Sequence, residues 1–188
     1  MKPILSCLTL ALICAAYLMG QESTKPPDVP IPKDGQSLLV YYKAMLRAYK
    51  RGDTARFHQL VSYFELPHKD AWIKDKFAAD QVTTVSTKYS ESFEDFSAEL
   101  VRIFGQAPGP EAAITITPIP QGGGFPPPAN SPAPKTKVLM ESYKFELTLS
   151  PNATLEWMTS YVQVGGGLRY IGGGAYPFWE QQTRRVKP

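Results

Sequence analysis

Few residues in this chain have side chains suited to acid–base chemistry. The chain has 188 residues, of which only two are histidines. His58 lies beside Phe57 in a helical pattern, which favours a position at the solvent edge of a helix. His68 follows Pro67 and precedes Trp72, so it is the one histidine that we consider as a base at the mouth of a pocket. Nothing else in the sequence supports catalysis there, so we assign no catalytic residue and keep His68 as a candidate only.

Patterns for metal binding and nucleophilic catalysis are also missing. Glu65, His68 and Asp70 are close in sequence, but Pro67 breaks the helix on which a Glu-x-x-His pair would share a face. The chain has no Gly-x-Ser-x-Gly elbow and no Ser-x-x-Lys motif. Its glycine triplets at 122–124, 165–167 and 172–174 lack the lysine and the setting of a phosphate loop. We therefore predict no metal and no cofactor.

Aromatic side chains are the more promising resource for binding. One set lies on successive predicted strands and consists of Tyr143, Trp157, Tyr161 and Tyr170. These residues either line one wall of a pocket or fill the core against helical phenylalanines, and we favour the core. A second set surrounds Pro177 near the end of the chain and consists of Tyr176, Phe178 and Trp179. This second set either covers the sheet, which we favour, or forms a surface that docks a ligand or partner.

The first twenty residues have the pattern of a secretory signal. Lys2 precedes an apolar run from Ile4 to Met19, and the sequence becomes polar after Gly20. We expect cleavage after Gly20, which makes the protein secreted or periplasmic. Both cysteines of the chain lie within this segment, so the exported form has no thiol and no disulfide. The apolar run of about sixteen residues is just short of the ~17 to 25 of a membrane helix, so an uncleaved anchor is the alternative.

The charge of the expected exported form is nearly balanced. Removing residues 1–20 removes one lysine and leaves 19 basic and 17 acidic residues, a net charge of +2. This excess is too small to indicate nucleic acid as a partner. The basic tail at 180–188 holds Arg184, Arg185 and Lys187, which we interpret as a frayed, solvated terminus.

The rest of the chain is predicted to form a spacer and one domain. Residues 21–33 contain four prolines and are expected to be an extended spacer, and residues 34–179 form the domain. Apolar residues at three- and four-residue spacing predict a helix from Asp34 to Gly52 and a second that starts at Asp53. A third helix follows Pro67. A long helical stretch covers 80–104, with an expected break at its serines at 90 and 92.

The second half of the chain changes to the two-residue period of strands. Residues 114–117 alternate isoleucine and threonine, and we expect the prolines at 118 and 120 to end this strand. A Pro/Gly-rich loop at 118–136 precedes further strands at 143–149 and 155–164, and Gly165–Gly167 allows the chain to reverse into a last strand. These elements predict an α+β fold, with N-terminal helices packed on a curved, mostly antiparallel four-stranded sheet.

Two segments of the chain resemble a known superfamily. They are the corner Tyr49-Lys50-Arg51-Gly52-Asp53 between two helices, and Gly167-Leu168-Arg169-Tyr170-Ile171 at the end of long strands. Over about residues 35–175 the chain resembles the nuclear-transport-factor-like superfamily, also called SnoaL-like. The resemblance implies a cone whose sheet wraps a pocket, in proteins that include ketosteroid-isomerase-like enzymes, dehydratases and noncatalytic binding domains. The long helical stretch at 80–104 and the proline-rich insertion depart from that pattern.

We expect an exported, noncatalytic binding or assembly module of the bacterial envelope. Its partner would be a small apolar ligand or an envelope protein, with a homodimer as one form of assembly. A membrane would be a partner only if the signal segment stays uncleaved. The alternative is a cone-type isomerase or hydrolase-like enzyme that uses a pocket carboxylate or His68, and a cavity filled by aromatic side chains would exclude it.

Overall fold

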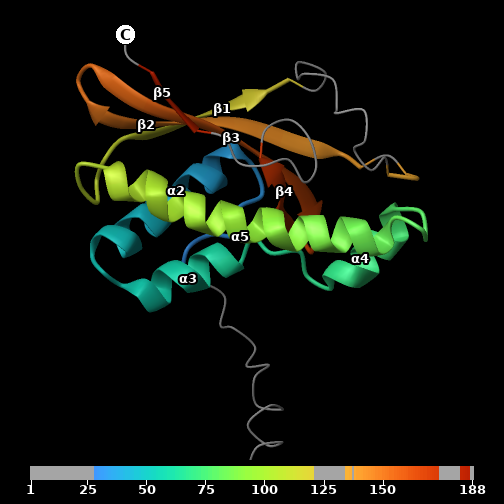
Figure 1. Ribbon diagram of the computed structural model, residues 1–188. Helices are drawn as coiled ribbons and strands as arrows, with labels where there is room; N and C mark the ends of the chain where they lie inside the picture. Colours follow the sequence, from blue (N-terminus) through green and yellow to red (C-terminus); the bar gives the residue numbers. More distant parts are fainter. Residues whose placement is uncertain (1–27, 121–133, 137, 174–182, 187–188) are drawn as a thin grey trace, which may run out of the picture.

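A computed structural model describes residues 28–120, 134–136, 138–173 and 183–186 (Figure 1). In this part of the chain four helices precede five strands. The helices are α2 (Gly35–Lys50), α3 (Thr54–Ser62), α4 (Lys69–Lys76) and α5 (Val82–Gln106). The strands are β1 (Ile114–Ile119), β2 (Met140–Ser150), β3 (Ala153–Val164), β4 (Gly167–Gly173) and β5 (Thr183–Val186). The predicted signal segment and the aromatic set Tyr176, Phe178 and Trp179 lie outside the described residues.

The predicted helical hairpin is confirmed, together with the polar residues that begin each helix. Asp34 caps α2: its side chain accepts from the Ser37 N–H at 2.8 Å, and the Ser37 hydroxyl accepts from the Asp34 N–H at 3.1 Å. Gly52 has a φ of 72°, a left-handed conformation that suits glycine at the end of a helix. Asp53 then caps α3 by accepting from the Arg56 N–H at 3.0 Å.

The long helix α5 is continuous, so the break expected at its two serines is wrong. Both hydroxyls have partners outside the helix. The buried Ser92 hydroxyl lies 2.8 Å from the Tyr170 hydroxyl of β4. The Ser90 hydroxyl accepts from the Lys69 ammonium at 2.7 Å. Each serine is thus engaged by another element, and the helix continues through both.

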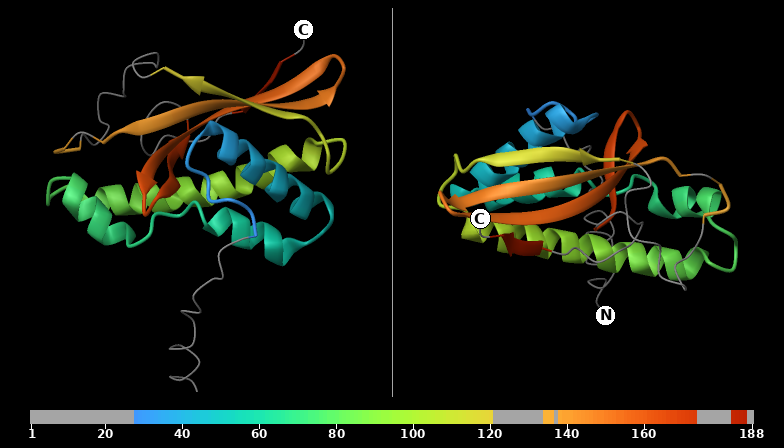
Figure 2. Two further views of the ribbon diagram at one scale, coloured as in Figure 1. Left: turned by 180° about the vertical axis from the view of Figure 1, so that it is seen from behind. Right: turned by 90° about the horizontal axis from the view of Figure 1, so that it is seen from above.

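The predicted fold class is confirmed: the helices cover one face of a curved antiparallel sheet (Figures 1 and 2). The strand order is β1-β2-β3-β4, and all the pairs are antiparallel. The core lies between this sheet and the helices. Among its fully buried side chains are Leu38, Tyr41, Tyr42 and Met45 of α2, and Phe145, Leu147 and Tyr161 of the sheet.

Pro118 does not end β1, which continues to Ile119. The register explains why. Ala113 and Thr148 are joined by a hydrogen bond of 3.0 Å, and Ile114 lies opposite Leu147, so the bonded positions of β1 are 115, 117 and 119. The backbone N–H direction of residue 118 therefore points away from β2. The N–H that a proline lacks at this position costs no hydrogen bond to that strand. A proline is tolerated there because β1 lies at the end of the strand order.

Both ends of the folded unit extend beyond the predicted boundaries. At the start, Val29 packs against the core, and the Pro32 carbonyl accepts from the Leu168 N–H at 2.7 Å. The last residues of the predicted spacer thus belong to the fold. At the other end, Thr183–Val186 pairs with Thr154–Trp157 of β3, so this part of the basic tail is a strand and not a frayed terminus. In the described residues no helix is both long and apolar enough to cross a membrane.

Candidate binding pocket

The four strand aromatics that we predicted as a binding set lie in the core. Tyr143 is 5% exposed, Trp157 2%, and Tyr161 and Tyr170 are fully buried. The Trp157 ring stacks on Phe145 with centroids 5.1 Å apart, and the Tyr170 ring stacks on Phe96 at 4.3 Å. The side of the sheet that faces the helices is therefore packed with aromatic rings, as the favoured core interpretation required.

The polar groups inside this core include several hydroxyls and the indole N–H of Trp157. Tyr42 of α2 and Tyr161 of β3 place their hydroxyl oxygens 2.6 Å apart. Burial, the largest cause for each, raises the pKa of both hydroxyls well above that of a free tyrosine. Of the polar and charged residues that the structure describes, only Ser92, Thr159 and Ser160 are buried, so none of its carboxylates or histidines is. This neutral interior offers a ligand no general base.

The hydroxyl pair makes a testable contribution to stability. Tyr161→Phe leaves the Tyr42 hydroxyl buried without this partner, and we expect a loss of about 2 kcal/mol in the free energy of unfolding. Tyr42→Phe should cost a similar amount. The double variant should cost little more than either single one, because both partners are then gone. Urea unfolding of the four proteins measures this coupling, and simple additivity of the two losses would contradict it.

Neither histidine lies in an enclosed site. His68 precedes α4 with a φ of 51°, is exposed, and makes no capping hydrogen bond with its side chain. His58 is also exposed on α3. No group of three or more metal-ligating side chains occurs in the described ranges. Among the described residues, neither a carboxylate nor His68 is buried.

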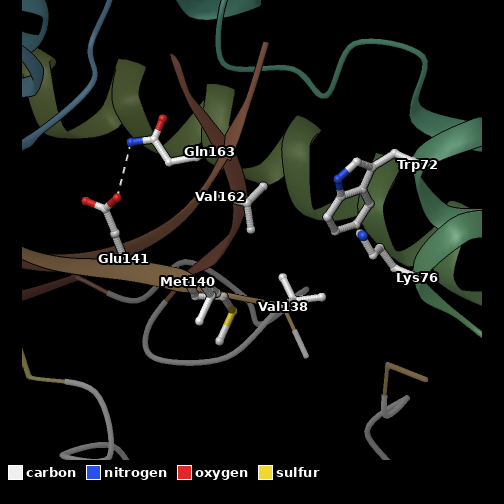
Figure 3. A pocket seen from close by; sticks show the side chains of 8 residues that line it. Trp72, Lys76, Val138, Met140, Glu141, Val162 and Gln163 are labelled. Atoms are coloured by element: carbon white, nitrogen blue, oxygen red, sulfur yellow. Dashed lines mark hydrogen bonds between the residues drawn. The ribbon is translucent and has the colours of Figure 1, made fainter. Parts of the chain in front are cut away.

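A pocket of about 450 Å³ lies where β2 begins and β3 ends, beside α4 (Figure 3). Its lining combines residues from these three parts of the fold, namely Trp72 and Lys76 of α4, Val138, Leu139, Met140 and Glu141 at the start of β2, and Val162 and Gln163 of β3. This site was not predicted from the sequence. The signal available was the apolar run at 138–140 where β2 begins, which contains more apolar residues than one core-facing side requires.

The apolar part of the pocket is accessible. Leu139 is 64% exposed, although it is a large aliphatic residue. Met140 and Val162 are direct neighbours across β2 and β3, and Trp72 is half-buried on α4. Figure 3 shows Trp72 and Lys76 on one side of the pocket and the strand residues on the other. An accessible hollow with an indole and aliphatic side chains in its walls can hold an apolar group.

The polar groups of the strand wall are joined to the start of the fold. One oxygen of Glu141 accepts from the Tyr143 hydroxyl at 2.6 Å, and the other accepts from the Gln163 amide at 3.2 Å. The same amide nitrogen donates to the Lys33 carbonyl at 2.7 Å. Burial and, after it, Glu141 raise the pKa of the Tyr143 hydroxyl, so this hydroxyl remains a donor at neutral pH. These bonds fix the orientation of the strand wall.

The charged side chain of the helix wall is that of Lys76, the one lysine among the lining residues. The Lys76 ammonium pairs with Asp75 at 2.7 Å, and the hydrogen bond from Lys76 lowers the pKa of the Asp75 carboxyl. Lys135 binds the end of α4 through two bonds, from its N–H to the Lys76 carbonyl at 2.8 Å and from its ammonium to the Lys74 carbonyl at 2.9 Å. Cations are favourable at this end of a helix.

No family model, curated protein or solved structure matches this chain.

Proposed function

We propose that this protein is an exported, noncatalytic binding module, and that the pocket between α4 and the β2–β3 strands holds a small, mainly apolar ligand. The observation that carries the proposal is the pocket itself. Its volume of about 450 Å³ falls within the ~300 to 1,000 Å³ typical of small-molecule sites. Five of its eight lining residues are apolar, and the other three, Lys76, Glu141 and Gln163, place polar groups in its walls.

The filled interior supports binding without catalysis. An isomerase or hydrolase of the cone type needs a titratable group in a dry pocket. The carboxylates and histidines of the described residues lie outside the buried core, and the pocket's own carboxylate, Glu141, is already bonded through both of its oxygens. The surrounding chain thus uses Glu141 to orient the strand wall.

Export rests on the first twenty residues and stays a prediction, as do the resemblance to the SnoaL-like superfamily and a homodimer. The N-terminal signal pattern and the lack of cysteines after it support the bacterial envelope or the surrounding medium as the place where the module works. Residues 28–33 attach the start of the fold next to the pocket, since Lys33 shares the Gln163 amide with Glu141.

The proposal is tested with the uncharged fluorescent probe N-phenyl-1-naphthylamine. The purified protein should bind it with increased fluorescence, and Trp72→Ala should weaken binding at least ~10-fold, because an indole face of the site is lost. Leu139→Gln should also weaken it. Val101→Gln is the matched control, since Val101 is an exposed aliphatic residue of α5 that does not line the pocket. Absence of probe binding, or an equal loss in the control, would count against the proposal.

A further inference from the structure

We infer that the ligand of this pocket carries one anionic group, a carboxylate on an aliphatic body, and that Lys76 binds this group. The inference rests on the proposed function, because it assigns the chemistry of the ligand at the same site. It begins from the unequal charges of the two walls, since the helix wall is cationic and the strand wall carries a single carboxylate, Glu141.

The charges around the helix wall favour an anion. Lys76 pairs with Asp75 at the end of α4, and the Lys135 ammonium binds the Lys74 carbonyl at the same end. Two ammonium groups and one carboxylate leave this end of the helix with an excess positive charge, and Glu141 lies on the other wall. An anionic group would complete this balance, whereas a cationic one would increase the excess.

Lys76 is the cation placed to meet the ligand. It is the lysine in the pocket lining, and its side chain is only 29% exposed. Asp75 accepts from the Lys76 ammonium, which has three donors, so donors are left for a second acceptor. Partial burial strengthens such a charge-assisted bond relative to one on an open surface.

The strand wall determines which way the ligand lies. The Glu141 carboxylate repels an anion, and its two oxygens already accept from Tyr143 and Gln163. The anionic end is therefore directed toward α4, and the aliphatic body lies along Met140, Val162 and Leu139. A neutral ligand of the same shape would fill the apolar part of the pocket but would leave the remaining donors of the Lys76 ammonium without an anionic acceptor.

The test compares three ligands with the same ten-carbon chain but different head groups: decanoate, decanol and decyltrimethylammonium. Each is titrated below its micelle concentration against protein loaded with N-phenyl-1-naphthylamine. We expect decanoate to displace the probe at about fivefold lower concentration than decanol, and the cation to be the weakest. Octanoate should bind about tenfold more weakly than decanoate, because two methylenes fewer are buried. Added salt should weaken only the binding of decanoate.

Charge variants of α4 assign the effect to Lys76. Lys76→Gln should weaken decanoate about fivefold and leave decanol unchanged. Asp75→Asn should tighten decanoate binding, because it removes the acceptor that competes for Lys76, and a misfolded protein would not show such a gain. Arg51→Gln is the control with the same change of charge, in the distant turn between α2 and α3.

The possible outcomes separate the charge of the ligand, the role of Lys76 and the proposed function. Equal binding of decanol and decanoate, or tighter binding of the cation, would overturn the anionic ligand and leave the binding module intact. Unchanged decanoate affinity in Lys76→Gln would overturn the role of Lys76. Failure of the wild-type protein to bind the uncharged probe at all would overturn the proposed function itself.

Discussion

Raising the pH from about 9 to about 11 is expected to remove on the order of 7 kcal/mol from the free energy of unfolding. The reason is the unusual number of tyrosine hydroxyls inside this fold. Five tyrosines are fully buried, and burial is the largest cause that raises the pKa of each hydroxyl above its ordinary value near 10: Tyr41, Tyr42, Tyr89, Tyr161 and Tyr170.

The direction follows from proton linkage. Above pH 10 these tyrosines ionise in the unfolded chain but stay protonated in the folded one, so the unfolded state binds fewer protons and stability falls as the pH rises. The stability that these protonated hydroxyls contribute is fully present below the pKa of tyrosine in the unfolded chain. At about pH 11 each of the five costs about 1.4 kcal/mol, since one pKa unit corresponds to that free energy. The sum approaches the whole stability of an ordinary domain, which is ~5 to 15 kcal/mol.

The measurement is urea unfolding at a series of pH values, with the ultraviolet absorbance of tyrosinate recorded alongside. Absorbance of these five tyrosinates should appear together with the loss of structure. The double variant Tyr42→Phe/Tyr161→Phe is the control, because it removes two of the five groups and should show about three fifths of the alkaline decline. Tyrosinate formation by these five buried tyrosines in the folded protein, without loss of stability, would contradict the prediction.

The helices could be predicted well from the sequence because their signals are local. Apolar spacing and the capping residues Asp34 and Asp53 placed both ends of α2 and the start of α3 to within a residue or two. The errors occurred where a distant element decided the outcome. Ser92 does not break α5, and its hydroxyl lies beside the Tyr170 hydroxyl of β4. Pro118 remains within β1, because its register with β2 places residue 118 where no hydrogen bond to that strand is needed.

The pocket could not be predicted for the same reason. Its parts come from α4, from the start of β2 and from the end of β3, which are separated by many residues in sequence. The aromatic residues on the strands could be recognised from the sequence, but they form the core and do not line the pocket. Because that pattern fills the interior of the fold, the accessible apolar surface lies at the end of the sheet, where Trp72 faces the first residues of β2.

Phe64→Ala is expected to lower the free energy of unfolding by about 4 kcal/mol, because it leaves a cavity at the centre of the aromatic core. Phe64 is fully buried just after α3, and its ring lies between elements that are distant in sequence. Its neighbours, by centroid distance, are Tyr41 at 5.1 Å, Tyr161 at 5.6 Å, Tyr42 at 5.9 Å and Phe96 at 6.0 Å. No single neighbour can move into the space without losing its own packing.

Phe93→Ala is the matched control for this cavity. Phe93 packs against Tyr89, Phe96 and Tyr170 but is half-buried on α5, so its removal should cost about half as much. Denaturant unfolding, followed by tryptophan fluorescence, measures both losses. Since Phe64 does not line the pocket, the folded Phe64→Ala protein should still bind the uncharged probe with nearly wild-type affinity. A larger loss of stability in Phe93→Ala than in Phe64→Ala would show that the core is not centred on Phe64.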